Sequence, residues 1–176
     1  STLPAGWRRS PLDAMRLVKD AHEQALMRRA AEISSGAHRR AMATTRPGWF
    51  EYQVEAELAH EFLRSGAQAV AYPSIVAGGP NACVLHYRDN SRQLQDGELL
   101  LIDAGCEYQG YASDITRTYP VSGKFGDEQA RVYRAVYQAQ EDVFAAIKPG
   151  VSMADLQKVA EASIERSGYL DAFIHG

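Results

Sequence analysis

The 176-residue chain lacks the features that mark several classes of protein. Its formal net charge is only −3, which gives no electrostatic case for a nucleic acid or an anionic membrane as partner. The apolar run Leu99–Ile102 is far shorter than the roughly 20 residues that cross a bilayer. The N-terminus has no basic patch followed by an apolar stretch, so we expect no signal peptide. It also lacks an initiator methionine, which is typical of a processed or cut start.

Cysteine is scarce as well. Cys83 and Cys106 are too few for a disulfide framework, so we expect a cytoplasmic protein whose two thiols are small buried residues. The length suits one domain or most of one. A hydrophobic content of 45% and a charged content of 23% are typical of a globular protein.

Proline and glycine divide the chain into helical and extended segments. We predict a long helix from a cap at Ser10 to the stop at Arg46-Pro47-Gly48, and further helices over residues 51–64, 127–148 and 152–167. Strands are predicted over residues 70–76, 84–87, 99–107 and 111–119, with the last two joined by a short turn.

A pattern of helix, Pro-Gly, helix and Arg-Ser-Gly occurs twice. Pro47 precedes Ser65 by 18 positions, and Pro149 precedes Ser167 by 18. The alternatives are an internal duplication and chance, because helix ends often share proline and glycine. A true duplication predicts a truncated two-fold structure, since only eight residues follow Gly168 and leave no room for the strands of a second copy.

Two aspartates occupy the predicted hairpin. Asp103 follows four apolar residues and should be partly buried, while Asp114 lies in the next strand. A turn centred on Tyr108-Gln109 would place them directly opposite each other, and one centred on Gln109-Gly110 would pair Asp103 with Thr116 instead. Either register puts the two carboxylates on one face, about 5–8 Å apart at Cβ.

Two carboxylates at that separation repel each other unless a proton or a cation lies between them. Oxygen ligands suit Mg, Mn or Zn, and paired metals in hydrolases lie about 3.5–4 Å apart. The hairpin therefore predicts metal binding, and the alternative is a solvent-facing hairpin with scattered acids.

The five histidines divide into two groups. His22, His38 and His60 lie in helical patterns among charged residues, and we expect all three at the surface. His86 and His175 each end an apolar segment. Taken alone, each is more typical of a satisfied core histidine than of a functional one.

Three segments of the sequence resemble aminopeptidase P (Xaa-Pro aminopeptidase). They are V-L-H-Y at 84–87, D-G-E-L-L-L-I-D-A-G-C-E-Y at 96–108 and G-Y-A-S-D-I-T-R-T-Y-P-V-S-G-K-F at 110–125. The lead-in over residues 10–48 continues the resemblance, so it covers nearly the whole chain. Prolidases share much of this pattern, but D-A-G-C-E-Y favours aminopeptidase P.

The resemblance implies the pita-bread fold, an internally duplicated α+β domain with a curved antiparallel sheet. It also implies two divalent metal ions, usually manganese, with Asp103 and Asp114 matching metal ligands of the family. Tyr72 and Thr116 match groups that lie close to those ligands. The fold expected here is incomplete: the first repeat and the helices of the second.

The implied activity is release of the N-terminal residue from peptides with proline in second position, through a hydroxide held by the two metals. His86 and His175 match histidines that lie near the substrate and stabilise the tetrahedral intermediate. Peptide is therefore the expected partner, and assembly into a homo-oligomer is left open. The alternatives are an Xaa-Pro dipeptidase (prolidase) and a non-catalytic pita-bread module that binds peptides or proteins.

The chain departs from the family where its sequence stops. The family's remaining ligands are a histidine and two glutamates that lie beyond the position of Gly176, and its N-terminal domain would precede residue 1. We therefore expect residues 1–176 to be the N-terminal part of the catalytic domain, with little or no activity alone.

Overall fold

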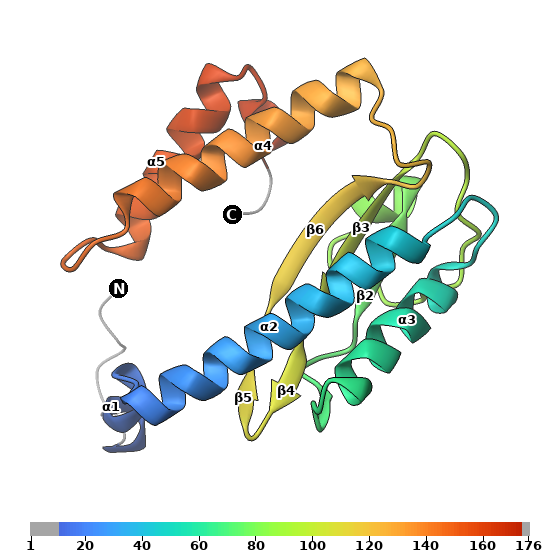
Figure 1. Ribbon diagram of the computed structural model, residues 1–176. Helices are drawn as coiled ribbons and strands as arrows, with labels where there is room; N and C mark the ends of the chain where they lie inside the picture. The colour runs from blue at the N-terminus through green and yellow to red at the C-terminus, as the bar shows by residue number, and fades with distance from the viewer. Residues whose placement is uncertain (1–10, 174–176) are drawn as a thin grey trace. The chain divides into compact units, whose positions relative to one another are not determined.

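The computed structural model describes residues 11–173, which belong to two compact units (Figure 1). The N-terminal unit ends at Gly123 and the C-terminal unit begins at Lys124. Across the residues described, no helix is long and apolar enough to cross a membrane.

The predicted first helix is two helices, so the expectation of one continuous helix was wrong. α1 spans Pro11–Leu17 and α2 spans Ala21–Thr44. Asp20 interrupts them by capping α2: its carboxylate accepts from the Glu23 amide at 2.8 Å, and its own amide donates to the Glu23 carboxylate at 2.7 Å. This reciprocal capping box satisfies two amides at the helix start. The predicted cap at Ser10 lies outside the described residues.

Two small antiparallel sheets follow α3, which spans Glu51–Arg64 as predicted. The first has the order β2-β3-β6 and the second the order β1-β4-β5. In chain order the strands are β1 Ala69–Val70, β2 Ile75–Gly78, β3 Leu99–Ala104, β4 Cys106–Tyr108, β5 Tyr111–Ala112 and β6 Ile115–Pro120.

All four strand predictions need correction. The continuous strands predicted over 99–107 and 111–119 are each interrupted, by Gly105 between β3 and β4 and by residues 113–114 between β5 and β6. Residues 71–74 bend, so the predicted strand over 70–76 becomes β1 and β2. No strand forms at 84–87, where a short 3-10 helix, Gly79–Cys83, runs into a turn. The apolar run there is exposed, with Val84 at 54% and Leu85 at 62%, so it does not pack into the core.

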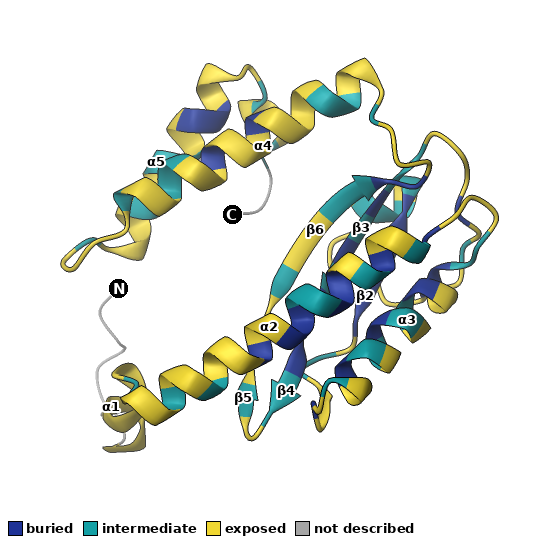
Figure 2. Cartoon of the chain, viewed as in Figure 1, coloured by how far each residue is buried: buried dark blue, intermediate teal, exposed yellow. Residues whose placement is uncertain are grey.

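The core of the N-terminal unit lies between the first sheet and the helix pair α2 and α3 (Figures 1 and 2). β3 alternates between its two faces, because Leu100, Ile102 and Ala104 are fully buried while Leu99, Leu101 and Asp103 are half-buried. The helices contribute a buried stripe at the spacing of helical turns; its apolar members are Ala30, Ile33, Ala37, Ala41, Val54, Leu58 and Phe62. Asp103 therefore lies on the face turned away from these helices.

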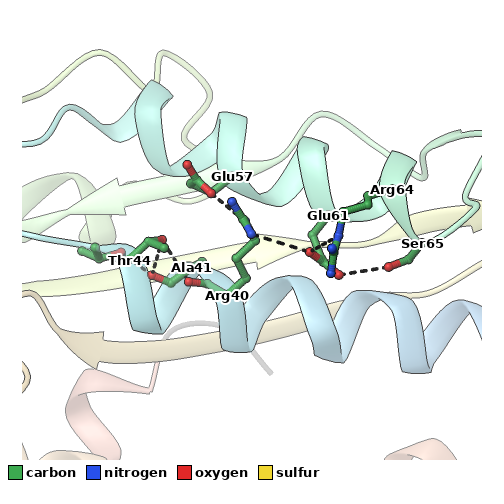
Figure 3. Close-up of polar contacts among 8 residues, drawn as sticks. Arg40, Ala41, Thr44, Glu57, Glu61, Arg64 and Ser65 are labelled. Carbon is green, nitrogen blue, oxygen red and sulfur yellow. Dashed lines mark hydrogen bonds and ion pairs between the residues drawn. The ribbon is translucent and has the colours of Figure 1, made fainter.

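A polar network joins α2 to α3 on their outer side (Figure 3). Arg40 donates to Glu57 at 2.6 Å and lies 4.0 Å from Glu61. Arg64, at 3.3 Å, and the Ser65 hydroxyl, at 3.0 Å, both contact Glu61. The Ser65 hydrogen bond, with help from the arginines, lowers the pKa of the Glu61 carboxyl. Ion pairs near the surface contribute little even when half-buried, as Arg40 and Glu57 are, so the packed stripe dominates the α2–α3 interface.

The C-terminal unit is a helical hairpin. α4 spans Asp127–Ala146 and α5 spans Met153–Arg166, followed by a 3-10 turn at Leu170–Ala172. The predicted cap at Ser152 is confirmed, because its hydroxyl accepts from the Asp155 amide at 3.1 Å.

The two copies of the sequence repeat have the same local structure. α3 and α5 both contain 14 residues, and each begins three residues after a Pro-Gly. Gly48 and Gly150 have φ of 88° and 92°, and Gly66 and Gly168 have φ of 95° and 77°. Because glycine tolerates this left-handed conformation best, the two copies share the backbone conformation that flanks their helices as well as the residue types. The agreement favours duplication over chance.

Candidate functional site

The hairpin that carries the two aspartates has the second of the two predicted registers. Asp103 is paired with Thr116 across β3 and β6, and Tyr108 with Tyr111 at the tip. The turn residues Gln109 and Gly110 have φ of 50° and 84°, the pair of positive angles that a two-residue hairpin turn of type I′ requires. Asp114 lies immediately before β6, two residues from Thr116.

Tyr72 brings the two aspartates together. Its hydroxyl lies 2.6 Å from Oδ1 of Asp103 and 3.0 Å from Oδ1 of Asp114, within donating distance of both. Tyr72 lies in the bend between β1 and β2, and this bend is fixed by the Ala71 amide, which donates to the Gly105 carbonyl at 2.9 Å. Three separate segments therefore converge on one hydroxyl.

The environment keeps that hydroxyl protonated. Burial raises the pKa of Tyr72 well above its usual value, and the hydrogen bonds to Asp103 and Asp114 raise it further, because a phenolate would face two carboxylates. The Tyr72 hydroxyl has one proton for two acceptors, so it donates fully to only one of the two carboxylates at any moment. Oxygen atoms clustered in this way are suited to a hard divalent cation.

The backbone beside the aspartates is unusually close-packed. A Cβ placed on Gly105 would lie 1.8 Å from the Ser113 carbonyl oxygen, a distance that no side chain can occupy. Gly105 separates β3 from β4, and Ser113 and Asp114 separate β5 from β6. Only glycine permits this approach, which brings the segments bearing Asp103 and Asp114 together.

A buried pair of hydroxyl groups, one of them from α2, lies beside Gly105 and Ser113. The hydroxyl oxygens of Ser34 and Ser113 are 2.7 Å apart, and the Cys106 amide donates toward both, at 3.0 and 3.1 Å. The Cys106 thiol donates to the Ala30 carbonyl at 3.4 Å. Cys106 is buried as predicted, whereas Cys83 is exposed and that part of the prediction was wrong.

His38 lies one helical turn after Ser34 and is buried, at 3% exposure, so the prediction of a surface histidine was wrong. Its Nε2 lies 3.1 Å from the Ala104 carbonyl and must donate to it. Among the side chains that the structure describes, its Nδ1 is the buried nitrogen without a hydrogen-bond partner. Burial lowers the pKa of His38, which favours the neutral ring. His22 and His60 are exposed, as predicted.

The structure thus groups four of the six predicted site residues. Asp103, Asp114 and Tyr72 are in contact, and Thr116 is paired with Asp103. His86 is exposed, at the turn that follows the 3-10 helix, with φ of 55°. His175 lies outside the described residues.

The donor set within residues 11–173 fits part of a metal site. Asp103 and Asp114 supply carboxylate oxygens, but no third histidine, cysteine, aspartate or glutamate of this stretch joins them in a cluster that could hold a metal. Two carboxylates are fewer ligands than structural or catalytic metal sites ordinarily use. The residues present therefore suit a divalent cation as one half of a ligand shell.

Comparison with known proteins places the chain in a family of metallopeptidases. The chain matches the metallopeptidase family M24 over residues 25–176, and it belongs to that family. Its curated relatives include an Xaa-Pro aminopeptidase of Haemophilus influenzae, 42% identical over 96% of this chain and 43% of that protein. An Xaa-Pro aminopeptidase of Escherichia coli is 50% identical over 81% of this chain and 32% of that protein.

Solved structures give the same result. A substrate complex of an E. coli aminopeptidase P variant matches with a TM-score of 0.87 and 43% identity, covering 91% of this chain and 38% of that one. Pseudomonas aeruginosa aminopeptidase PepP matches with a TM-score of 0.86 and 48% identity, covering 92% and 37%. The expected fold is confirmed: an α+β structure that corresponds to part of the pita-bread fold. The chain spans 32–43% of the length of these proteins.

Proposed function

We propose that the protein is a metal-dependent aminopeptidase that releases the N-terminal residue from peptides with proline in second position. The observation that carries this proposal is the convergence of Asp103 and Asp114 on the Tyr72 hydroxyl, in a chain of family M24. Relatives named Xaa-Pro aminopeptidase support the substrate class. A zinc-substituted E. coli aminopeptidase P, solved with product, supports a divalent metal.

Each site residue has a proposed task in this reaction. Asp103 and Asp114 would hold two divalent metals, manganese by preference, together with ligands from outside residues 11–173. When bound, such metals act as Lewis acids and activate water. Tyr72 keeps the two carboxylates at a fixed separation, and Thr116 borders Asp103 on the same face. His86 and His175 would donate hydrogen bonds to the negative charge that develops on the scissile carbonyl.

We also propose that residues 1–176 form the N-terminal part of the catalytic domain. The matched aminopeptidase P structures are covered only to 37–38%, which agrees with this placement. The duplication seen in α3 and α5 supports it too, since only the first copy is followed by a sheet within the described residues.

A cleavage assay on the intact protein tests the proposal. With Mn²⁺ present, we expect N-terminal residue release from a tripeptide with proline in second position and none from the matched alanine peptide. Asp114→Asn should lower the rate by at least about a hundredfold, because it removes a charged ligand. The matched control, Asp96→Asn at an exposed turn, should retain the parent rate of cleavage.

The outcomes separate the alternatives. Metal-independent cleavage, or equal rates for the two variants, would contradict the proposed role of Asp114. Cleavage of Xaa-Pro dipeptides alone would identify a prolidase instead. The absence of both metal and cleavage would identify a non-catalytic module.

A further inference from the structure

Glu51 is a charged residue with no place in the proposed chemistry, yet it is completely buried. It is the first residue of α3. Its Oε1 accepts from the Gly78 amide at 2.7 Å and the Asn81 side chain at 3.0 Å. Its Oε2 accepts from the Tyr87 hydroxyl at 2.7 Å and the Arg92 amide at 2.9 Å. Every partner lies between residues 78 and 92.

This arrangement uses the whole acceptor capacity of a carboxylate, which has about four lone-pair sites. A buried charge is poor evidence for a purely stabilising role, because a well-packed apolar residue often serves stability equally well. What an apolar residue cannot do is fix four donors from one loop in a single geometry. Glu51 therefore determines the path of the loop between β2 and β3.

The loop that Glu51 fixes carries His86. Tyr87, the next residue, is held at both ends: its hydroxyl donates to Glu51, and its amide donates to the Val84 carbonyl at 3.2 Å. His86 itself has φ of 55°, a conformation that costs a non-glycine residue free energy unless its surroundings impose it. The two hydrogen bonds that restrain Tyr87 hold the neighbouring His86 backbone in this conformation.

A second carboxylate on α3 repeats the arrangement one helical turn later. Glu55 accepts from the side-chain amide of Asn90 at 2.9 Å. Asn90 is buried, and its own oxygen accepts from the Val76 amide of β2 at 3.0 Å. The loop is thus attached to α3 at two points that follow His86, at Tyr87 through Glu51 and at Asn90 through Glu55.

We propose that Glu51, acting through the Tyr87 hydroxyl, is a positioning residue for His86. The inference rests on the proposed function, in which His86 faces the reacting carbonyl. Glu51 and Tyr87 touch neither substrate nor metal in this scheme. They set the direction of the imidazole by fixing the turn that carries it.

The test uses Tyr87→Phe in the intact protein, because loss of Glu51 itself would leave four donors unpaired, one buried and three partly buried, and threatens folding. Tyr87→Phe keeps the ring and removes one hydroxyl. The matched control is Tyr111→Phe, since the Tyr111 hydroxyl also donates to a carboxylate, that of Glu23, at 2.6 Å. Both variants are made in the parent protein and in His86→Ala.

We expect Tyr87→Phe to lower kcat by about tenfold with little change in KM, because a misplaced group loses transition-state contacts first. In the His86→Ala background the same change should have no further effect, since the residue it acts through is gone. Tyr111→Phe should leave kcat unchanged in both backgrounds. An equal loss from Tyr87→Phe in both backgrounds would overturn the proposal.

Amide hydrogen exchange gives a second readout that needs no activity. Tyr87→Phe should speed exchange at residues 84–87 by about tenfold while exchange in α2 stays unchanged. Unchanged exchange at residues 84–87 would refute the restraint, whether or not the protein cleaves peptides. Failure of the parent protein to cleave any Xaa-Pro peptide would instead count against the proposed function, and the exchange result would still decide whether Tyr87 holds the loop.

Discussion

The hydroxyl of Tyr72 lies 2.6 Å from the carboxylate of Asp103 and donates to it from the bend between β1 and β2. Asp114 shares the same donor at 3.0 Å. A phenol whose pKa is raised in this way stays protonated across the physiological range, so it remains a donor throughout that range. The contact therefore offsets the repulsion between the two carboxylates without a cation.

Removing that hydroxyl should destabilise the metal-free protein. We expect Tyr72→Phe to lower the free energy of unfolding by about 1 kcal/mol, because the two carboxylates lose their shared donor while the site stays half-exposed to water. Urea denaturation in the presence of a chelator measures this. Tyr52→Phe, at an exposed position on α3, is the control and should change the free energy of unfolding by no more than about 0.5 kcal/mol. Equal effects of the two variants would contradict the role given to Tyr72.

Two glycines should respond in opposite directions to the same substitution. Gly105→Ala should lower the free energy of unfolding by about 3 kcal/mol or more, because its Cβ would overlap the Ser113 carbonyl oxygen. Gly36→Ala, within α2 and with open space around the new methyl group, should raise it by about 0.5–1 kcal/mol. Thermal unfolding of both variants measures the contrast, and a mild effect at Gly105 would show that the strands can move apart.

His38 should make stability depend on pH. Burial lowers its pKa in the folded state, so the unfolded chain binds the proton more readily. The stability that this residue contributes is present above the unfolded pKa of about 6.5 and is lost as pH falls from there toward the lower folded value. We expect the free energy of unfolding of the parent protein to fall more steeply between about pH 7 and 5 than that of His38→Gln. His60→Gln, on the exposed side of α3, should retain the parent slope.

The 176-residue chain alone should bind metal weakly. Its described part brings two carboxylates together and no third clustered ligand, so isothermal titration with Mn²⁺ should give no tight, stoichiometric binding of two ions. The intact protein is the comparison and should bind more tightly. Tight binding of two ions by the 176 residues would refute this expectation.

The sequence is most informative where periodicity and covalent geometry decide the structure. Two-residue alternation in a hairpin restricts Asp103 and Asp114 to one face, and the register found is one of the two predicted. Ser-Gly pairs locate the C-terminal ends of α3 and α5, because glycine with positive φ ends helices, and a Pro-Gly pair precedes the start of each. The proposed peptide substrate and the proposed number of metals rest on family resemblance rather than on these patterns.

The incorrect predictions, and the residue that the sequence did not single out, have physical explanations. The apolar stripe continues past Leu17, which conceals the break before α2, although Asp20 and Glu23 have the spacing of a capping box. The arginines that follow His38 favour a surface position, yet this residue lies four positions after Ser34 on the buried stripe. Glu51 does not stand out in the sequence, since its four partners lie 27–41 residues away and only the tertiary fold unites them.

The double attachment of the loop to α3 has a consequence for its length. Because Glu51 and Glu55 are one helical turn apart, Tyr87 and Asn90 must meet them at a matching separation along the chain. An insertion or deletion between these two residues would disengage one carboxylate whatever the identity of the added residues. We therefore expect the stretch from 78 to 92 to tolerate substitutions at most positions better than a change in its length.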